Sequence, residues 1–409
     1  MSEIANYYYQ RGGMVHGAAL DMTKAFDTIL YSELFKKIIS KGVPHIAVRV
    51  LMFAYQEQYG WVRIAGSNSD NFTIRNGTRQ GSVISPSLFS CYINELLQRL
   101  RAKNLGCSVA GVWMGASTYA DDLFLLSPNR PTLQKMMDVC QDYGKEHNLA
   151  LSTDPVPAKS KSKCIIFSGN KRLQEMPPPI MLDGKALPYV DHLDHLGHVL
   201  HKSMSMEMDC TRATKSFKRR AHDITDQLHF CHPRQVMKMV NTYVGDCYGS
   251  NLWRLNSSYA TSFYSRWNVT ARNVFDVRFD THVNVVEGFL CKDIVSLKSQ
   301  VLSRYPKFVR KLLDSTSKEV RFLSRILLTD QRSNLCNNIS YLSDATKINN
   351  VIMVAGWRIR QALKEKCTLE PWRENLLATF MKIKCDKSYE DFNMTKQQLN
   401  DFIDSLLIS

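Results

Sequence analysis

The chain has 409 residues, 44% of them hydrophobic, which is enough for two or three domains with sizeable cores. A formal net charge of +15 indicates a polyanionic partner, either nucleic acid or an anionic membrane surface. The longest strongly apolar run, Val351 to Trp357, is far too short to cross a bilayer, so we expect no membrane partner. No secretion signal opens the chain and its cysteine count, 11, is odd, which favours free thiols inside the cell, in nucleus or cytoplasm.

The positive charge is distributed unevenly along the chain. Residues 1–200 hold 21 Lys and Arg against 17 Asp and Glu, a net charge of +4. Residues 201–409 hold the remaining 32 against 21, a net charge of +11. We therefore expect an acidic cluster in the first half and a basic surface mostly in the second.

Residues 1–200 alternate between strand and helix patterns, which predicts an α+β fold. Helices are expected where apolar residues recur every three or four positions, and strands where short apolar runs are bounded by turn residues. In chain order we expect a strand at Ala18–Met22, helices around Leu34–Ile39 and Val48–Tyr55, strands at Trp61–Ala65 and Asn71–Arg75, a helix at Ser87–Leu100, a strand at Leu123–Leu126, a helix at Thr132–His147, and strands at Cys164–Phe167 and within His192–Leu200.

From about Met204 onward the pattern is helical. Arg212, Lys215 and Arg219 fall at i, i+3 and i+7, which places them on one helix face. A solvated surface is the plain reading of such a face; contact with nucleic-acid phosphates is the functional one.

Near the C-terminus, Thr395 and Gln398 have the spacing of a capping box, in which two side chains satisfy free backbone groups at a helix start. The helix after it would carry an apolar stripe that we expect to be core, made of Leu399, Phe402, Ile403 and Leu406.

Paired aspartates stand between an aromatic residue and an apolar run in Tyr119-Ala120-Asp121-Asp122, which Leu123–Leu126 follow. Carboxylates at the edge of a buried strand repel each other and lose solvation, so they need a compensating cation. A tight turn at Ala120-Asp121 and a third carboxylate, Asp21, at the end of another strand would complete a site for two Mg²⁺ ions roughly 3.5–4 Å apart. Alone, Asp-Asp is a common dipeptide that is more often exposed or salt-bridged.

Three segments together are much more specific. LDMTKAFD (residues 20–27), GTRQGSVISPSLFSCYINELL (residues 77–97) and YADD (residues 119–122) resemble motifs A, B and C of reverse transcriptases from LINE-type (non-LTR) retrotransposons. The resemblance implies a right-hand palm, an antiparallel sheet with helices, followed by a helical thumb. It further implies an RNA-directed DNA polymerase that uses Mg²⁺, with Mn²⁺ as a possible substitute, on an RNA template, a DNA primer and deoxynucleoside triphosphates.

The resemblance also assigns roles to individual residues. Asp21 and Asp121 would bind the metal ions directly, with Asp122 as the supporting carboxylate. Phe26 would exclude a ribonucleotide 2′-hydroxyl, although a core role describes it equally well. The residues expected along the template and incoming nucleotide are Arg79, Gln80, Gly81 and Tyr119.

Two weaker segments follow in the order of the family. The loop before Cys164 resembles motif D, whose lysine protonates departing pyrophosphate; Lys159, Lys161 and Lys163 are all candidates, and counting back from Phe167 favours Lys161. The segment HLDHLGHVL (residues 192–200) resembles motif E, the hairpin that grips the primer, with His195, Leu196 and Gly197 at its centre. His195 is expected to pack rather than to catalyse.

The resemblance divides the chain into a palm with a remnant of the fingers (1–200), a thumb-like helical region (201–320) and a helical C-terminal region of unknown role (321–409). Fingers motifs and an endonuclease are missing, so the chain resembles an element truncated at its N-terminus. Because positioning of the nucleotide alone can be worth orders of magnitude in rate, we expect this chain to be weakly active or inactive.

Three alternatives remain at this point. A non-catalytic nucleic-acid-binding remnant would account for the charge of the second half. An RNA-dependent RNA polymerase shares a palm and paired aspartates, although Tyr119-Ala120 and Phe26 argue against it. A two-metal hydrolase would leave the motif B segment unexplained.

Overall fold

The computed structural model describes residues 1–79, 81–154, 156, 159–168, 177–245, 247–365, 375, 378–379, 395 and 397–401. The chain divides into two compact units, Met1–Ser205 (unit 1) and Met206–Ser409 (unit 2). The expected boundary at residue 200 lies close to this division, and the further division at residue 320 stays a prediction. Within the described residues, no helix has the length and apolar character needed to cross a membrane.

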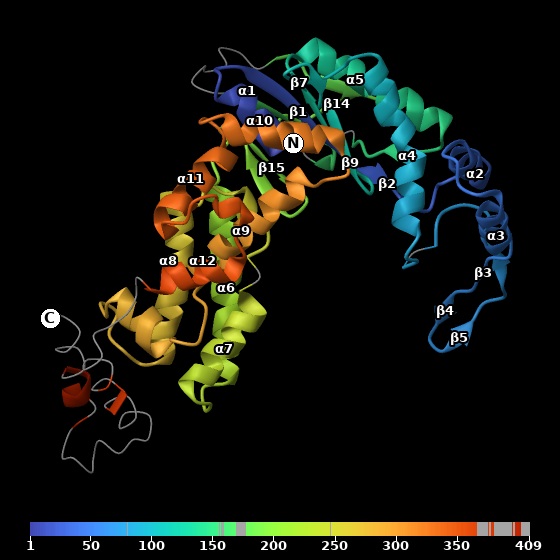
Figure 1. Ribbon diagram of the computed structural model, residues 1–409. Helices are drawn as coiled ribbons and strands as arrows, with labels where there is room; N and C mark the ends of the chain where they lie inside the picture. Colours follow the sequence, from blue (N-terminus) through green and yellow to red (C-terminus); the bar gives the residue numbers. More distant parts are fainter. Residues whose placement is uncertain are drawn as a thin grey trace. The chain divides into compact units, whose positions relative to one another are not determined.

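Unit 1 is built on a four-stranded antiparallel sheet in the order β12–β1–β10–β9 (Figure 1). These strands are β12 (Lys163–Ser168), β1 (Met14–Leu20), β10 (Asp122–Ser127) and β9 (Ala116–Tyr119). The central strand β10 is apolar from Leu123 to Leu126, and these side chains are fully buried. The expected strand at Ala18–Met22 instead begins at Met14 and ends at Leu20, and Met22–Thr23 forms a separate short strand, β2.

Two long helices, α4 (Ser85–Ala102) and α5 (Arg130–Glu146), pack against each other and against the sheet. Pro86 lies in the first turn of α4, where its missing N–H costs no hydrogen bond. Asn129 caps α5 by accepting a hydrogen bond of 2.9 Å from the Thr132 N–H. The helices bury large side chains of unit 1, among them Phe89, Tyr92 and Tyr143, each contributing about 1.5–3 kcal/mol to its stability. A short helix, α1 (Ser2–Tyr9), packs on β1.

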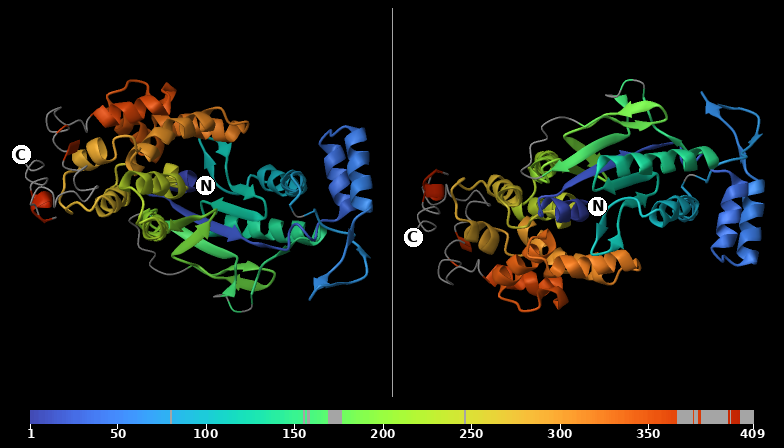
Figure 2. Two further views of the ribbon diagram at one scale, coloured as in Figure 1. Left: turned by 90° about the horizontal axis from the view of Figure 1, so that it is seen from below. Right: turned by 90° about the horizontal axis from the view of Figure 1, so that it is seen from above.

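Helices α2 (Tyr31–Ser40) and α3 (His45–Gln56) lie side by side at one end of unit 1 (Figure 2). A narrow ribbon follows them, made of β3 (Tyr59–Gly60), β4 (Arg63–Ile64), β5 (Ser67–Asn68) and β6 (Phe72–Thr73). Of the strands expected at Trp61–Ala65 and Asn71–Arg75, the structure forms only Arg63–Ile64 and Phe72–Thr73. The chain reverses at Ala65-Gly66, where both residues have positive φ, 48° and 89°, as a two-residue hairpin turn requires.

Short antiparallel pairs complete unit 1. Their strands are β2 with β11 (Ala150–Leu151), β7 (Ser108–Val109) with β8 (Val112–Trp113), β13 (Ile180–Leu182) with β14 (Lys185–Leu187), and β15 (His192–His195) with β16 (His198–His201).

Unit 2 is helical throughout its described part, as its sequence predicts. Its elements are α6 (Glu207–Gln227), α7 (Pro233–Val244), η2 (Ser250–Leu252), α8 (Ser258–Val274), η3 (Val285–Leu290), α9 (Leu297–Leu313), α10 (Lys318–Thr329), α11 (Asn334–Thr346), η4 (Val351–Met353) and α12 (Gly356–Lys364). A serine caps each of α8, α9, α10 and α11 through its side chain, which stabilises each helix by about 1 kcal/mol. Trp253 and Trp267 are almost fully buried in the core of this unit.

The capping box predicted near the C-terminus is present. The Thr395 N–H donates to the Gln398 side chain at 2.9 Å, and the Gln398 N–H donates to the Thr395 hydroxyl at 3.2 Å. Leu399, the first member of the expected apolar stripe, is fully buried. The other three members, Phe402, Ile403 and Leu406, lie outside the described residues.

Candidate active site

Strand β1 carries Asp21 to one end of the sheet. β1 pairs with β10 on one side and β12 on the other, and Leu20 lies opposite Leu123. Asp21 follows directly, and both of its backbone groups are bonded: its N–H donates to the Ser162 hydroxyl at 3.1 Å, and its carbonyl accepts from the Ser152 N–H at 2.7 Å. The backbone at Asp21 is therefore held on both sides.

The β9–β10 hairpin carries Asp121 and Asp122 to the same end of the sheet. Tyr119 pairs with Asp122, so Ala120 and Asp121 form the two-residue turn that the sequence predicts. Ala120 adopts the left-handed conformation with φ of 51°. Because Leu20 faces Leu123 in an antiparallel pair, Asp21 and Asp122 are the next positions along the two chains.

The three aspartates repel one another. Burial raises the pKa of Asp122 above its ordinary value, and the negative charges of Asp121 and Asp21 raise it further. Asp122 is half-buried, so a cation beside these carboxylates would relieve both effects. The residues present therefore fit a divalent metal ion, which reverse transcriptases generally use.

The carboxylate oxygens of the three aspartates are not drawn together as closely as metal ligands. Within the described part of the chain, the group of three potential ligands whose donor atoms all lie within 4.8 Å of one another is Glu95, Glu146 and His147.

Lys161 is the candidate motif D lysine that the structure places beside the aspartates. Its ammonium nitrogen lies 3.9 Å from Asp21 Oδ2, and its side chain is 75% exposed. The loop that carries it is fixed next to it, because Ser162 is fully buried and its carbonyl accepts a hydrogen bond of 2.9 Å from the Ser160 hydroxyl. Lys159 is exposed, and Lys163 begins β12, where it pairs with Ala19.

The motif A and motif B segments contact each other directly. The Thr78 N–H donates to the Phe26 carbonyl at 2.7 Å, and the Gly77 N–H donates to the Ile29 carbonyl at 2.9 Å. Gly77 has φ of 90°, and a Cβ there would lie 2.9 Å from the Asp27 backbone, so only glycine fits. The Phe26 ring packs on Phe89, with ring centroids 4.8 Å apart.

The remaining motif B residues lie on an exposed turn. Arg79 is exposed, and its carbonyl accepts a hydrogen bond of 2.6 Å from the Ser85 hydroxyl at the start of α4. Gly81 has φ of 81° and open space around it. Gln80 lies outside the described residues. Tyr119, directly before the Ala120-Asp121 turn, is 68% exposed.

The motif E segment is a hairpin, β15–β16, whose turn residues Leu196 and Gly197 have φ of 49° and 75°. The His195 ring packs on Phe124 of β10, with centroids 4.7 Å apart. Burial lowers the pKa of His195 to about 4, so the ring is neutral at physiological pH. This packing agrees with the expectation that His195 has no acid–base role.

The three basic residues expected to contact nucleic acid lie in unit 2. Arg212, Lys215 and Arg219 are exposed on α6. Arg212 is partly neutralised by an ion pair of 2.8 Å with the buried Asp209, which also accepts a hydrogen bond from the Trp253 indole.

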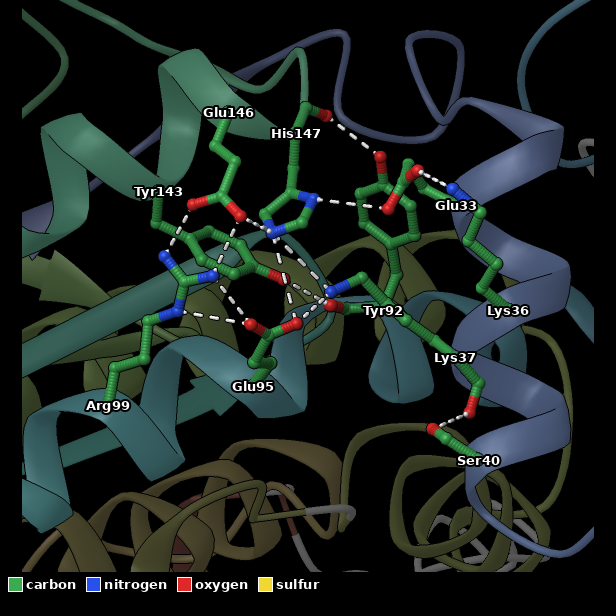
Figure 3. A network of polar contacts seen from close by, with 10 residues as sticks. All are labelled: Glu33, Lys36, Lys37, Ser40, Tyr92, Glu95, Arg99, Tyr143, Glu146 and His147. Atoms are coloured by element: carbon green, nitrogen blue, oxygen red, sulfur yellow. Dashed lines mark hydrogen bonds and ion pairs between the residues drawn. The ribbon is translucent and has the colours of Figure 1, made fainter.

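Sequence reasoning missed a polar network that joins α2, α4 and α5 (Figure 3). Arg99 of α4 donates two hydrogen bonds, of 2.6 and 2.9 Å, to Glu146 at the end of α5, and further ones to Glu95. Lys37 of α2 also donates to Glu95. His147 is buried within this group, and burial lowers its pKa. Because Lys37 and Arg99 already neutralise the carboxylates, the group is an ion-pair network rather than a metal site.

Comparison with known proteins identifies unit 1. Residues 3–197 match the family described as reverse transcriptase (RNA-dependent DNA polymerase). These residues are a reverse transcriptase domain. The prediction from motifs A, B and C is thereby confirmed. Neither an RNA-dependent RNA polymerase nor a two-metal hydrolase is favoured.

The relatives of this reverse transcriptase domain come from retrotransposable elements, as the motifs predict. A Pol polyprotein of the type-2 element R2DM of Drosophila melanogaster is 28% identical over 155 residues, which are 37% of this chain and 15% of the relative. A Pol polyprotein of the type-1 element R2 of Popillia japonica is 26% identical over 185 residues, 44% of this chain and 26% of the relative. The chain thus spans about a quarter or less of either relative.

Solved structures of telomerases are also similar to the chain. One of them is a telomerase from Candida albicans in complex with a TWJ fragment of telomeric RNA, with a TM-score of 0.35 and 11% identity. The similarity covers 81% of this chain and 52% of the telomerase chain.

Proposed function

We propose that this chain is an RNA-directed DNA polymerase of a non-LTR retrotransposon, which extends a DNA primer along an RNA template. The observation that carries the proposal is the meeting of Asp21, Asp121 and Asp122 at one end of the palm sheet, inside a reverse transcriptase domain. Their mutual repulsion, seen in the raised pKa of Asp122, suits a site that is completed by cations.

Two Mg²⁺ ions, or Mn²⁺ in their place, would be held by Asp21 and Asp121 with support from Asp122, and would supply the positive charge that activates a primer 3′-hydroxyl and stabilises the phosphates. The chain itself supplies position. The hydrogen-bonded backbone of Asp21 and the two-residue turn at Asp121 fix the positions from which these two carboxylate side chains extend.

Other residues of the domain select and orient the substrates in this proposal. Phe26 is held by Phe89 and by its carbonyl bond to Thr78, so its ring is a rigid wall against a 2′-hydroxyl. Lys161, beside Asp21, holds a proton where pyrophosphate leaves. Arg79, Gly81 and Tyr119 offer an exposed surface to template and deoxynucleoside triphosphate.

Primer extension by the purified chain tests the proposal. With Mg²⁺, an RNA template and an annealed DNA primer, the chain should incorporate deoxynucleotides in template order, at the low rate that the sequence leads us to expect. Asp121→Asn should lower the rate by about 10³-fold or more, because it removes a charge that acts on the developing transition state. Asp142→Asn is the matched control, since Asp142 is exposed on α5 and should leave the rate unchanged.

The non-catalytic alternative makes a different prediction in the same experiment. A nucleic-acid-binding remnant would bind template and primer in a salt-sensitive way and show no extension. Extension that persists in Asp121→Asn would equally contradict the proposed site.

A further inference from the structure

Unit 2 contains a pocket lined by residues of α6, α7 and α8, with a volume of about 610 Å³. Figure 1 labels these three helices. Two helix stripes face it. On α6 these are positions 218, 221, 222 and 225, and on α8 positions 266, 269, 270, 273 and 274, both at helical spacing. The volume lies within the range of pockets that hold small-molecule ligands.

The pocket is lined by cationic and not by acidic side chains. Lys218 of α6 and Arg266 of α8 contribute fixed positive charges, and His222 and His229 also line the pocket. No aspartate or glutamate is among the described lining residues. The Arg266 Nε is buried and has no hydrogen-bond partner among the residues that the structure describes. Because this nitrogen is not accessible to solvent, an anion in the pocket would interact with the charge of the guanidinium group rather than with Nε itself.

The start of α7 adds to this positive potential. Pro233, the first residue of this 12-residue helix, lines the pocket beside Cys231. The N-terminus of a helix carries partial positive charge and favours anions nearby. The N–H groups of Arg234, Gln235 and Val236 already donate to His232, so the helix contributes only its dipole and the side chains would bind the phosphate.

The rest of the pocket suits a flat heterocycle better than a bare anion. Val236, Val269 and Val274 provide apolar walls. The Thr225 and Thr270 hydroxyls donate within their own helices, to His222 and Arg266 carbonyls, so their lone pairs remain to accept hydrogen bonds. Asn273 offers both a donor and an acceptor, as the edge of a nucleobase requires.

We propose that this pocket binds a single nucleotide, with its phosphate between Lys218 and Arg266 and its base against the valine walls. The nucleotide has two possible sources, a free nucleotide or an unpaired nucleotide of a bound strand. The pocket lies wholly within unit 2, so this binding needs neither the palm carboxylates nor a divalent metal ion.

Equilibrium dialysis of radiolabelled AMP against the whole chain, with EDTA present, tests the proposal without metal-dependent binding in the palm. Wild type should bind AMP saturably. Lys218→Gln should weaken this binding by about tenfold, since one charge-assisted hydrogen bond is lost, and Arg266→Gln should do at least the same. Lys307→Gln is the matched control, because Lys307 is exposed on α9, outside the pocket, and should bind like wild type.

Lys218 is exposed, so Lys218→Gln should fold even if Arg266→Gln does not. The proposal is overturned if wild type retains no AMP, if Lys218→Gln and Lys307→Gln bind equally, or if inorganic pyrophosphate displaces AMP as efficiently as unlabelled AMP does. Asp121→Asn should bind AMP normally, so a failed polymerase proposal and a failed pocket proposal give different results.

A competition experiment identifies the source of the nucleotide. If a short single-stranded oligodeoxynucleotide displaces AMP from wild type, the pocket takes a nucleotide of a bound strand. If AMP and the oligodeoxynucleotide bind together, the pocket takes a free nucleotide.

Discussion

The ion pair between Lys161 and Asp21 is weak. Its atoms are 3.9 Å apart, and Lys161 is mostly exposed, so the pair contributes about 0–1 kcal/mol to stability. Lys161 is therefore free to leave Asp21 for a stronger anion. In the function that we propose, a departing pyrophosphate would be such an anion, and Lys161 would donate its proton to it.

Replacing Lys161 should slow the chemical step without weakening substrate binding. We expect Lys161→Gln to lower kcat of primer extension by about 10²-fold, the contribution of a positioned general acid, and to leave KM for the nucleotide within a few-fold. Lys159→Gln, in the same loop but without a contact to Asp21, is the control and should retain the wild-type rate. Equal losses in both variants would mean that the loop acts only through its charge.

At the level of residues, the sequence predicts which residue types the proposed chemistry needs better than it predicts which residues contact each other. The three aspartates could be named because a metal site demands carboxylates near each other, whereas Lys161 rests on the resemblance to motif D and on its spacing from Phe167. The requirement for glycine at Gly77 could not, because it arises from the Asp27 backbone, 50 positions away along the chain. Turn glycines look alike in sequence, and only the fold shows which one touches a neighbouring backbone.

Among the elements, the β9–β10 hairpin is predicted well and β1 only in part. Leu123–Leu126 is an unbroken apolar run, which marks a buried strand. The first half of β1 contains His16 and Gly17, which interrupt the apolar run that would otherwise predict a strand there. A Cβ at position 17 would lie 3.0 Å from Ile165 and 3.1 Å from Phe167 of β12. Close packing against β12 therefore accounts for the glycine at this position.

The Lys37–Glu95–Arg99–Glu146 network could not be predicted, since only Glu95 and Arg99 are close in sequence. It joins three helices that approach one another only through tertiary packing. Burial raises the pKa of Glu95, but hydrogen bonds from Lys37 and Arg99 lower it by more, from 4.5 to about 2. The ionised carboxylate is thus favoured by the folded state, and the network should stabilise the contact between α2, α4 and α5.

This shift fixes the sign of a pH dependence. A carboxylate with a lowered folded-state pKa contributes stability above pH 4.5, and that contribution is lost as the pH falls toward 2. Because the Glu95 side chain is 37% exposed, solvent screening limits the expected loss in Glu95→Gln to about 1 kcal/mol near neutral pH. Urea unfolding of wild type and variant should show this difference at pH 7 and a shrinking difference between pH 4.5 and 2.

Glu57→Gln is the control for this comparison. Glu57 is exposed after α3 and makes only a long hydrogen bond of 3.5 Å with Tyr59. Its replacement should change stability by about 0.5 kcal/mol or less at every pH. A Glu95→Gln difference that stays constant down to pH 2 would show that packing, rather than charge, accounts for the loss.

For the whole molecule, the division of charge follows the division of the fold. The carboxylates expected to bind metal ions lie in unit 1, whereas residues 201–409 carry a net charge of +11. An acidic centre that binds cations cannot attract a polyanion unaided, so a basic surface elsewhere in the chain is needed to hold template and primer. The exposed face of α6 and the cationic pocket beside α7 are two described parts of unit 2 that carry some of this charge.

The α6 face should therefore determine how binding depends on salt. Each phosphate contact to duplex lowers log K by about 0.9 per unit of log salt concentration, so replacing Arg212, Lys215 and Arg219 by Gln should reduce the slope for an RNA–DNA duplex by about 2–3. Arg212 already pairs with Asp209, which places the expected value toward the lower end. A matched triple variant, Lys298→Gln, Lys307→Gln and Lys311→Gln, removes the same charge from exposed positions of α9. Equal changes in the two slopes would show that net charge alone attracts the duplex, and that α6 makes no phosphate contacts of its own.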